Sequence, residues 1–156
     1  MNKITKLAIS IVGCLLTGFL GSLVTTPSIP TWYQTLNKPF FSPPNWIFAP
    51  VWTTLYVLMG IALYLIWTKA AKTKQSKKAI YFFLIQLGLN FIWSFIFFGF
   101  QNPRLAFVEI IFLWIAILLT ILSFAKVSKS AAYLLVPYIV WVSFALVLNL
   151  FVAILN

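Results

Sequence analysis

The sequence has no histidine, one acidic residue (Glu109) and one cysteine (Cys14) among its 156 residues. Without histidine, the chain lacks the usual ligand of zinc and haem iron and the usual base of a serine-type triad. One cysteine excludes an internal disulfide, so the redox compartment cannot be inferred from it. A proton or ion pathway normally uses several ionisable groups inside the membrane, so one acid is also weak evidence for a pump.

Apolar residues dominate the composition of the chain. Hydrophobic residues make up 63% of the chain, charged residues only 8%, and the mean hydropathy is +1.04. A soluble domain of this length cannot bury that much apolar surface. The composition therefore indicates an integral membrane protein.

Five apolar segments are each long enough, at about 20 residues, to cross a bilayer core about 30 Å thick. They cover about 5–25, 46–68, 79–100, 105–125 and 131–155. The first is longer than a signal-peptide core and no A-x-A site follows it, which favours a retained helix. We predict one all-α membrane domain over residues 1–156, a bundle of five transmembrane helices.

The charges indicate an orientation. The net charge is +10, but the cations lie between apolar runs, as in membrane anchoring, and not in a nucleic-acid-binding patch. Nine cations precede the first segment or follow the second and fourth: Lys3, Lys6, Lys69, Lys72, Lys74, Lys77, Lys78, Lys126 and Lys129. The other side carries only Lys38 and Arg104. The positive-inside rule then places the N-terminus in the cytoplasm and the C-terminus outside.

Small side chains form two rows on the first segment: Ser10, Cys14, Gly18 and Ser22, and beside them Gly13, Thr17, Gly21 and Thr25. In lipid, helices associate along such strips. The strip fits contact with a neighbouring helix of the same bundle or, alternatively, a dimer face.

Polar and aromatic residues share helix faces in the later segments. Trp52, Tyr56 and Gly60 lie on one face of the second, and Gln86, Asn90 and Ser94 on one face of the third, with Trp93 beside them. Tyr138, Trp141, Ala145 and Asn149 lie on one face of the fifth. Amides are costly in hydrocarbon without partners, so Gln86, Asn90 and Asn149 should face the interior. They either tie helices together or line an aromatic small-molecule cavity.

A proline-rich stretch, LNKPFFSPPNWIFAPVW, leads from the first segment into the second. Pro39, Pro43 and Pro44 keep it from becoming helical, whereas Pro50 fits the first turns of the next helix. We predict a semi-rigid lid over about 27–45.

For Glu109, near the outer interface, we expect a structural hydrogen bond or a cation on another segment as its partner.

Three blocks of sequence resemble the TspO/MBR family of tryptophan-rich sensory proteins and translocator proteins, also called peripheral benzodiazepine receptors. They are WYQTLNKPFFSPPNWIFAPVWTTLYVLMG (32–60), LNFIWSFIFFG (89–99) and PYIVWVSFALVLN (137–149). RLAFVE (104–109) also matches a position where the family often has an acid. The blocks occur in the family's order and on the corresponding helices.

The resemblance implies a five-helix protein, often a homodimer, that binds porphyrins or haem in a pocket beneath the first loop, with no obligatory cofactor. It also implies synthetic isoquinoline carboxamide or benzodiazepine ligands. Trp52 and Trp141 match the tryptophans tied to a light- and oxygen-dependent porphyrin breakdown, so an enzyme is an alternative. The family resemblance and the spacing of polar and aromatic residues together give a set of candidate ligand-binding residues. They are Tyr33, Lys38, Pro44, Phe48, Trp52, Tyr56, Gln86, Asn90, Trp93, Tyr138, Trp141 and Ala145.

Two further alternatives remain open at this point. A sterol is a weaker expectation, because the chain ends in VLNLFVAILN, without the tyrosine and basic residue of the animal relatives' sterol segment. A formal sterol pattern, Leu58–Tyr64–Lys69, is of a kind that occurs by chance. In the second alternative the protein is a scaffold that recruits a partner through the basic loop 69–78. The same loop could instead only anchor the chain in the membrane. We expect a bacterial cell membrane as the location.

Overall fold

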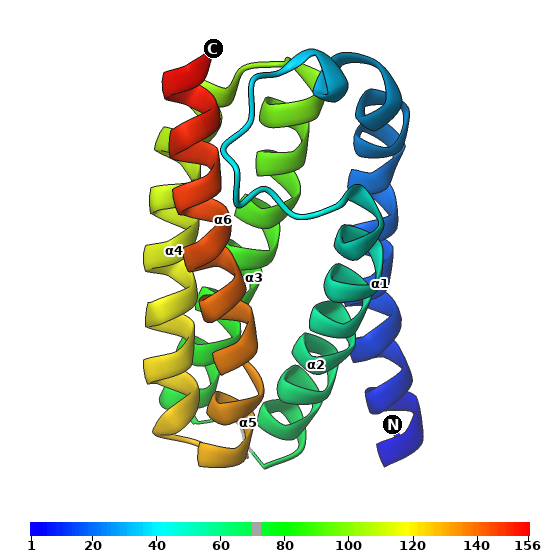
Figure 1. Ribbon diagram of the computed structural model, residues 1–156. Helices are drawn as coiled ribbons and strands as arrows, with labels where there is room; N and C mark the ends of the chain where they lie inside the picture. Colours follow the sequence, from blue (N-terminus) through cyan, green and yellow to red (C-terminus); the bar gives the residue numbers. More distant parts are fainter. Residues whose placement is uncertain (70–72) are drawn as a thin grey trace.

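The computed structural model describes residues 1–69 and 73–156, so Lys72, one of the cations counted above, lies outside the described residues. Within these ranges the chain forms an all-α bundle whose N-terminus and C-terminus lie at opposite ends (Figure 1). Its α-helices are α1 (Lys3–Ser28), α2 (Phe48–Lys69), α3 (Lys74–Ser94), α4 (Pro103–Ala125), α5 (Lys129–Leu134) and α6 (Val136–Leu155). Shorter turns extend three of them: π-helical turns at Ile29–Tyr33 and Phe95–Gly99, and a 3-10 turn at Asn45–Ile47.

Five helical stretches in the described ranges are long and apolar enough to cross a bilayer. They are Lys3–Tyr33, Asn45–Lys69, Lys74–Gly99, Pro103–Ala125 and Lys129–Leu155. The predicted five-helix membrane fold is therefore confirmed.

Side-chain caps mark where four of the helices begin. The side chains of Asn2, Thr73, Asn102 and Ser128 each accept a hydrogen bond from a backbone N–H three residues later, at 2.8 to 3.3 Å. Such caps satisfy N–H groups that have no partner inside the helix. The cap at Thr73 lets α3 begin at Lys74, five residues before the predicted 79.

The first helix is longer than predicted, because it continues through Pro27 to Tyr33. The predicted end at 25 and the predicted start of the lid at 27 are therefore wrong. A π-helical turn at Ile29–Tyr33 contains Pro30, and wider turns of this kind accommodate a missing N–H. Trp32 packs edge-on against Phe97, with ring centroids 5.6 Å apart, which anchors the extension to the far end of α3. The non-helical loop is thus only residues 36–44.

The last span is two helices and not one. Leu135 separates α5 from α6, and Pro137 follows at the start of α6. Proline removes a backbone donor and clashes with the preceding turn, so a continuous helix over 131–155 is interrupted there. The fourth helix begins at Pro103, two residues before the predicted 105. The second begins within the 3-10 turn at Asn45, one residue before its predicted start, and ends at Lys69.

The small-residue strip of α1 packs inside the bundle. Ser10 and Cys14 are buried, and Gly18 lies against the ring of Tyr56 on α2. A Cβ atom on Gly60 of α2 would lie 2.5 Å from Cα of Ile11, so the two backbones touch there. Of the two interpretations, contact within the bundle holds for the row from Ser10 to Ser22. Gly13, in the other row, has no neighbour within 4 Å.

We expect Gly60→Ala to lower the stability of the bundle, because its methyl group has to push the backbone of α1 away from α2. Overpacking of this kind costs about 1–3 kcal/mol. Gly88→Ala is the matched control, since a Cβ on Gly88 in the middle of α3 meets nothing within 4 Å. Thermal unfolding in detergent measures both variants. Equal midpoints for the two would contradict the close contact between α1 and α2.

Candidate functional site

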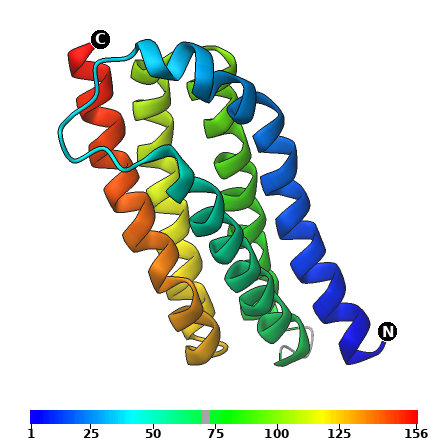
Figure 2. The same ribbon diagram turned by 45° about the vertical axis from the view of Figure 1, so that its right-hand side comes forward.

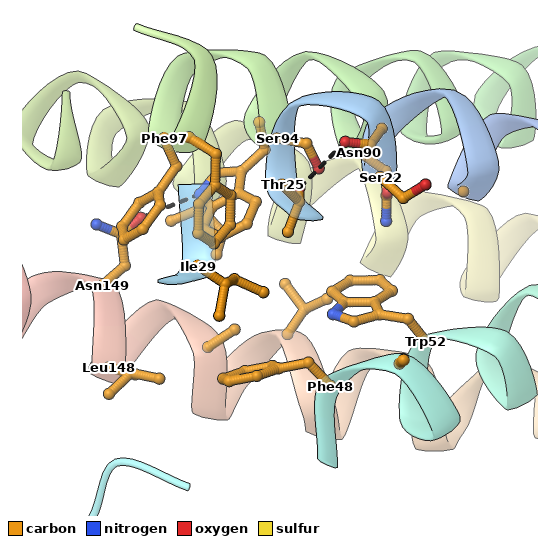
Figure 3. A pocket seen from close by; sticks show the side chains of 18 of the residues that line it. Ser22, Thr25, Ile29, Phe48, Trp52, Asn90, Ser94, Phe97, Leu148 and Asn149 are labelled. Carbon is orange, nitrogen blue, oxygen red and sulfur yellow. Dashed lines mark hydrogen bonds between the residues drawn. The ribbon is translucent and has the colours of Figure 1, made fainter. Parts of the chain in front are cut away.

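A cavity of about 210 Å³ lies inside the bundle, walled by α1, α2, α3, α4 and α6 (Figure 3). All five spans contribute to it, so it exists only in the assembled fold. From α1 and its extension come Gly18, Gly21, Ser22, Thr25, Thr26, Ile29 and Tyr33, and from the start of the second span Asn45, Phe48, Ala49, Trp52 and Tyr56. From α3 and α4 come Asn90, Trp93, Ser94, Phe97, Phe98, Ile110 and Leu113, and from α6 Trp141, Val142, Ala145, Leu148, Asn149 and Val152. No charged side chain is among these lining residues.

A chain of buried hydrogen bonds forms one end of the cavity. The hydroxyl of Tyr56 donates to Oδ1 of Asn90 at 2.6 Å, and Nδ2 of Asn90 donates to the hydroxyl of Tyr138 at 2.8 Å. Tyr138 in turn donates to Oε1 of Gln86 at 2.7 Å, and Nε2 of Gln86 lies 3.9 Å from the sulfur of Met59. The chain joins α2, α3 and α6, and each hydroxyl and amide in it has a partner. We call it the tyrosine–amide chain.

A second set of contacts fixes the opposite end. The indole N–H of Trp93 donates to Oδ1 of Asn149 at 3.0 Å, and Nδ2 of Asn149 donates to the carbonyl of Pro103 at 2.8 Å. The ring of Trp93 stacks on Phe97, with centroids 4.9 Å apart and an interplanar angle of 22°. Gln86, Asn90 and Asn149 are 1%, 3% and 2% exposed, which confirms that all three amides face the interior.

Two other tryptophans enter the cavity without such hydrogen bonds. Trp52 projects into it from α2 (Figure 3) and lies 5.7 Å, centroid to centroid, from the ring of Tyr56. Trp141, on α6, lies 6.2 Å from the ring of Phe48 and 5.4 Å from that of Phe144. Within residues 1–69 and 73–156, the buried indole N–H of Trp141 has no acceptor. The cavity therefore contains aromatic faces and a free hydrogen-bond donor but no charge.

The structure brings most of the candidate residues together. Eight of them line the cavity: Tyr33, Phe48, Trp52, Tyr56, Asn90, Trp93, Trp141 and Ala145. Gln86 and Tyr138 lie outside the lining but complete the tyrosine–amide chain that holds Asn90. Whether any of these residues binds a ligand stays a prediction.

Lys38 and Pro44 lie in the loop and not in the cavity lining. The ammonium of Lys38 donates to the carbonyl of Tyr33 at 2.8 Å and lies 4.3 Å from the centre of the Tyr33 ring. The loop is also held at α6, where Phe41 packs against Phe144 and Phe151. In this structure Lys38 thus secures the start of the loop.

Sequence reasoning missed the wall that α1 contributes. Gly18, Gly21, Ser22 and Thr25 line the cavity, as does Ile29 beyond the predicted end of the helix. Their four-residue spacing is visible in the sequence, where it predicts helix packing and not a cavity wall. A row of small residues allows close packing and, where no partner fills it, also leaves space.

Glu109 differs from its expectation. It is 9% exposed, and neither carboxylate oxygen has a hydrogen-bond partner in the described ranges. The expected structural hydrogen bond or cation partner is therefore not found there. Arg104, on the same helix, is exposed at the end of the bundle.

Comparison with known proteins agrees with this architecture. The model of the TspO/MBR family matches residues 10–155. The tryptophan-rich protein TspO of Archaeoglobus fulgidus is 49% identical over 154 residues, 99% of this chain and 99% of that protein. The protein of the same name from Chlorobaculum tepidum is 48% identical over 157 residues, 100% of this chain and 99% of its own. The translocator protein of Homo sapiens is 36% identical over 139 residues, 88% of this chain and 80% of its own. The chain therefore belongs to the TspO/MBR family, and it is a multi-pass integral membrane protein.

Proposed function

We propose that this protein is a membrane receptor or transporter-like protein that binds porphyrins and related flat apolar ligands in the cavity. The observation that supports this most is the set of three indoles, Trp52, Trp93 and Trp141, around one uncharged space. Indole and phenol rings offer offset-stacked and edge contacts to a flat aromatic ligand. A mostly apolar, aromatic wall with a few orienting polar groups is the usual make-up of a small-molecule site.

The polar groups supply orientation. The free N–H of Trp141 can donate to an acceptor on the ligand, and the hydroxyl oxygen of Tyr56 can accept a hydrogen bond while it donates to Asn90. A porphyrin carries both kinds of group, pyrrole N–H inside the ring and carboxylates at its edge. Lys38, at the loop, is a cation that could pair with such a carboxylate.

The cavity is smaller than most ligand sites. Its volume of about 210 Å³ lies below the range of about 300–1,000 Å³ usual for small-molecule pockets. A ligand as large as a porphyrin therefore requires the bundle to widen. Among the three indoles of the wall, those of Trp52 and Trp141 donate no hydrogen bond within the described residues, so they can move without breaking one.

The remaining expectations belong to the same proposal. The cation distribution favours a cytoplasmic N-terminus. A bacterial cell membrane is our expectation for the location. A homodimer fits the family resemblance, and the exposed face of α1, with Val12, Leu16, Phe19 and Leu23, is suited to lipid or a second copy. No part of the proposal requires a resident cofactor.

A second candidate function is the breakdown of the porphyrin itself by light and oxygen. It is favoured by the position of Trp52 and Trp141, whose rings line the same space and are held by aromatic contacts. In this case the protein would be an enzyme, with molecular oxygen as the co-reactant.

The first test compares metal-free protoporphyrin with haem. Since the chain has no histidine, haem lacks its usual axial ligand here, and binding depends on the ring. We expect protoporphyrin to bind at least as tightly as haem when both are titrated by quenching of tryptophan fluorescence. Trp114→Phe is the control for the fluorescence signal, because it removes a tryptophan that donates to Ser143 at 2.8 Å and is not in the cavity lining. Haem binding about tenfold tighter than protoporphyrin would contradict recognition of the ring.

The second test concerns Lys38. We expect Lys38→Gln to weaken protoporphyrin binding by up to about fivefold, the effect of a partly exposed ion pair worth up to about 1 kcal/mol. Protoporphyrin dimethyl ester has no carboxylate, so its affinity should not change. If both ligands weaken equally, Lys38 acts by holding the loop on Tyr33 and not by pairing with the ligand.

The third test decides between binding and breakdown. If the protein is an enzyme, illumination in air should remove the Soret absorbance of bound protoporphyrin. Trp52→Phe and Trp141→Phe should each abolish that loss, while Trp114→Phe should not. Absorbance and mass analysis of the product measure the outcome. Bleaching at the normal rate in both cavity variants would exclude the enzyme.

A further inference from the structure

A second hollow lies on the outer surface of the bundle, between α2 and α6. Val51, Thr54 and Leu58 line it on α2, and Val140, Trp141 and Phe144 line it on α6. The hydroxyl of Thr54 is already used, since it donates to the carbonyl of Pro50 at 2.8 Å. The hollow therefore presents an apolar surface at the depth of the spanning helices. We call it the α2–α6 groove.

The groove and the inner cavity share one lining residue. Among the described residues, Trp141 alone lines both of them. Its ring is in contact with the rings of Phe48 and Phe144, but its indole N–H has no acceptor in the described ranges. By contrast, the indoles of Trp93 and Trp114 are tied by hydrogen bonds of 3.0 and 2.8 Å. Trp141 can thus turn aside without breaking a hydrogen bond.

The backbone is also least closely packed at this seam. Among the described residues, α1 packs closely on α2, α3 on α4, and α4 on α6, whereas α2 and α6 have hardly any backbone contact. The end of α2 near Lys69 packs on α5. Above that contact in the figures, α2 and α6 stand apart (Figures 1 and 2). Aromatic side chains bridge the seam, including Phe48 to Trp141 and Trp52 to Tyr138. Moving these aromatic side chains aside disrupts side-chain contacts and no helix-to-helix backbone packing.

The other way into the cavity, through the loop 36–44, is held more firmly. The backbone N–H of Asn37 donates to Oδ1 of Asn156 at 3.0 Å, and Nδ2 of Asn156 donates to the carbonyl of Asn37 at 2.9 Å. Lys38 bonds the carbonyl of Tyr33, and Phe41 packs on two rings of α6. Lifting the loop would break all of these contacts together.

We propose that the α2–α6 groove is the entrance by which a flat apolar ring dissolved in the bilayer reaches the cavity, with Trp141 as its gate. This inference rests on the proposed function, because it takes the cavity to be the ligand's destination. The occupant of the groove is the same ligand on its way in. Two observations favour this occupant over a polar partner: the two spaces share Trp141, whose indole N–H is unbonded, and the groove has an apolar lining.

The experiment measures release, which follows the same path as entry in reverse. Protoporphyrin dimethyl ester is bound to the full chain in vesicles, and the vesicles are mixed with an excess of empty ones. Recovery of tryptophan fluorescence gives the release rate, and a titration gives the affinity. Val140→Phe adds a ring to the groove, and because phenylalanine replaces valine the number of tryptophans is unchanged. Val140 is 63% exposed, so the ring is added at a lipid-facing position.

We expect Val140→Phe to slow release about tenfold, equivalent to about 1.4 kcal/mol in the barrier, and to leave the affinity unchanged. Val147→Phe is the matched control, since Val147 is 43% exposed on the same helix but outside the groove. It should release the ester at the normal rate. A second arm joins Asn37→Cys to Asn156→Cys by a cross-link in a Cys14→Ala background. With the loop fastened in this way, release should stay normal.

The outcomes separate the two proposals. Normal release from Val140→Phe, or equal slowing by Val140→Phe and Val147→Phe, overturns the lateral entrance. So does slow release from the cross-linked loop, because the path would then pass under the loop. In each of these cases the ester still binds, and the proposed function stands. If the unmodified protein binds no porphyrin or ester at all, the proposed function fails and the entrance fails with it.

Discussion

The tyrosine–amide chain is the constraint on which the centre of this molecule depends. In a bilayer no water is present to satisfy a polar group, so Tyr56, Asn90, Tyr138 and Gln86 are stable only if they meet one another. Each bond of this kind contributes on average about 0.6 kcal/mol, but a missing partner would leave a buried donor or acceptor unpaired. Because the four side chains come from α2, α3 and α6, their pairing links these three helices.

The cavity has walls from these three helices and from α1. The chain links α2 to α6 through Asn90, while α1 approaches α2 closely enough for Gly60 to touch Ile11. On α1, Gly18 lies against the ring of Tyr56 and Gly21 lies beside Ser94, and both glycines line the cavity. The small residues of α1 therefore both pack closely on other helices and form one wall of the cavity.

The bundle and much of the cavity could be predicted from the sequence, because both depend on patterns that recur over a few neighbouring residues. Spans follow from apolar length, and interior amides follow from four-residue spacing, since hydrocarbon excludes unpaired polar groups. The true end of the first helix could not be predicted from local periodicity. Pro27 and Pro30 signal a break, yet a π-helical turn and the packing of Trp32 on Phe97 carry the helix to Tyr33. That outcome depends on residues about 65 positions away.

Lys38 and Glu109 show the same limit for charged groups. Their types suggested partners, a ligand's acidic edge and a cation, but partners are set by three-dimensional neighbours. Lys38 instead secures the carbonyl of Tyr33, and Glu109 lies buried without a partner in the described ranges. The loop is held at Asn37, Lys38 and Phe41. The helices pack closely where α1 meets α2, α3 meets α4 and α4 meets α6, whereas α2 and α6 have hardly any backbone contact. The proposed entrance depends on two features together, a small cavity and the unbonded indole of Trp141 at that seam, because a large ligand then needs space at the place where the wall has no hydrogen bond to break.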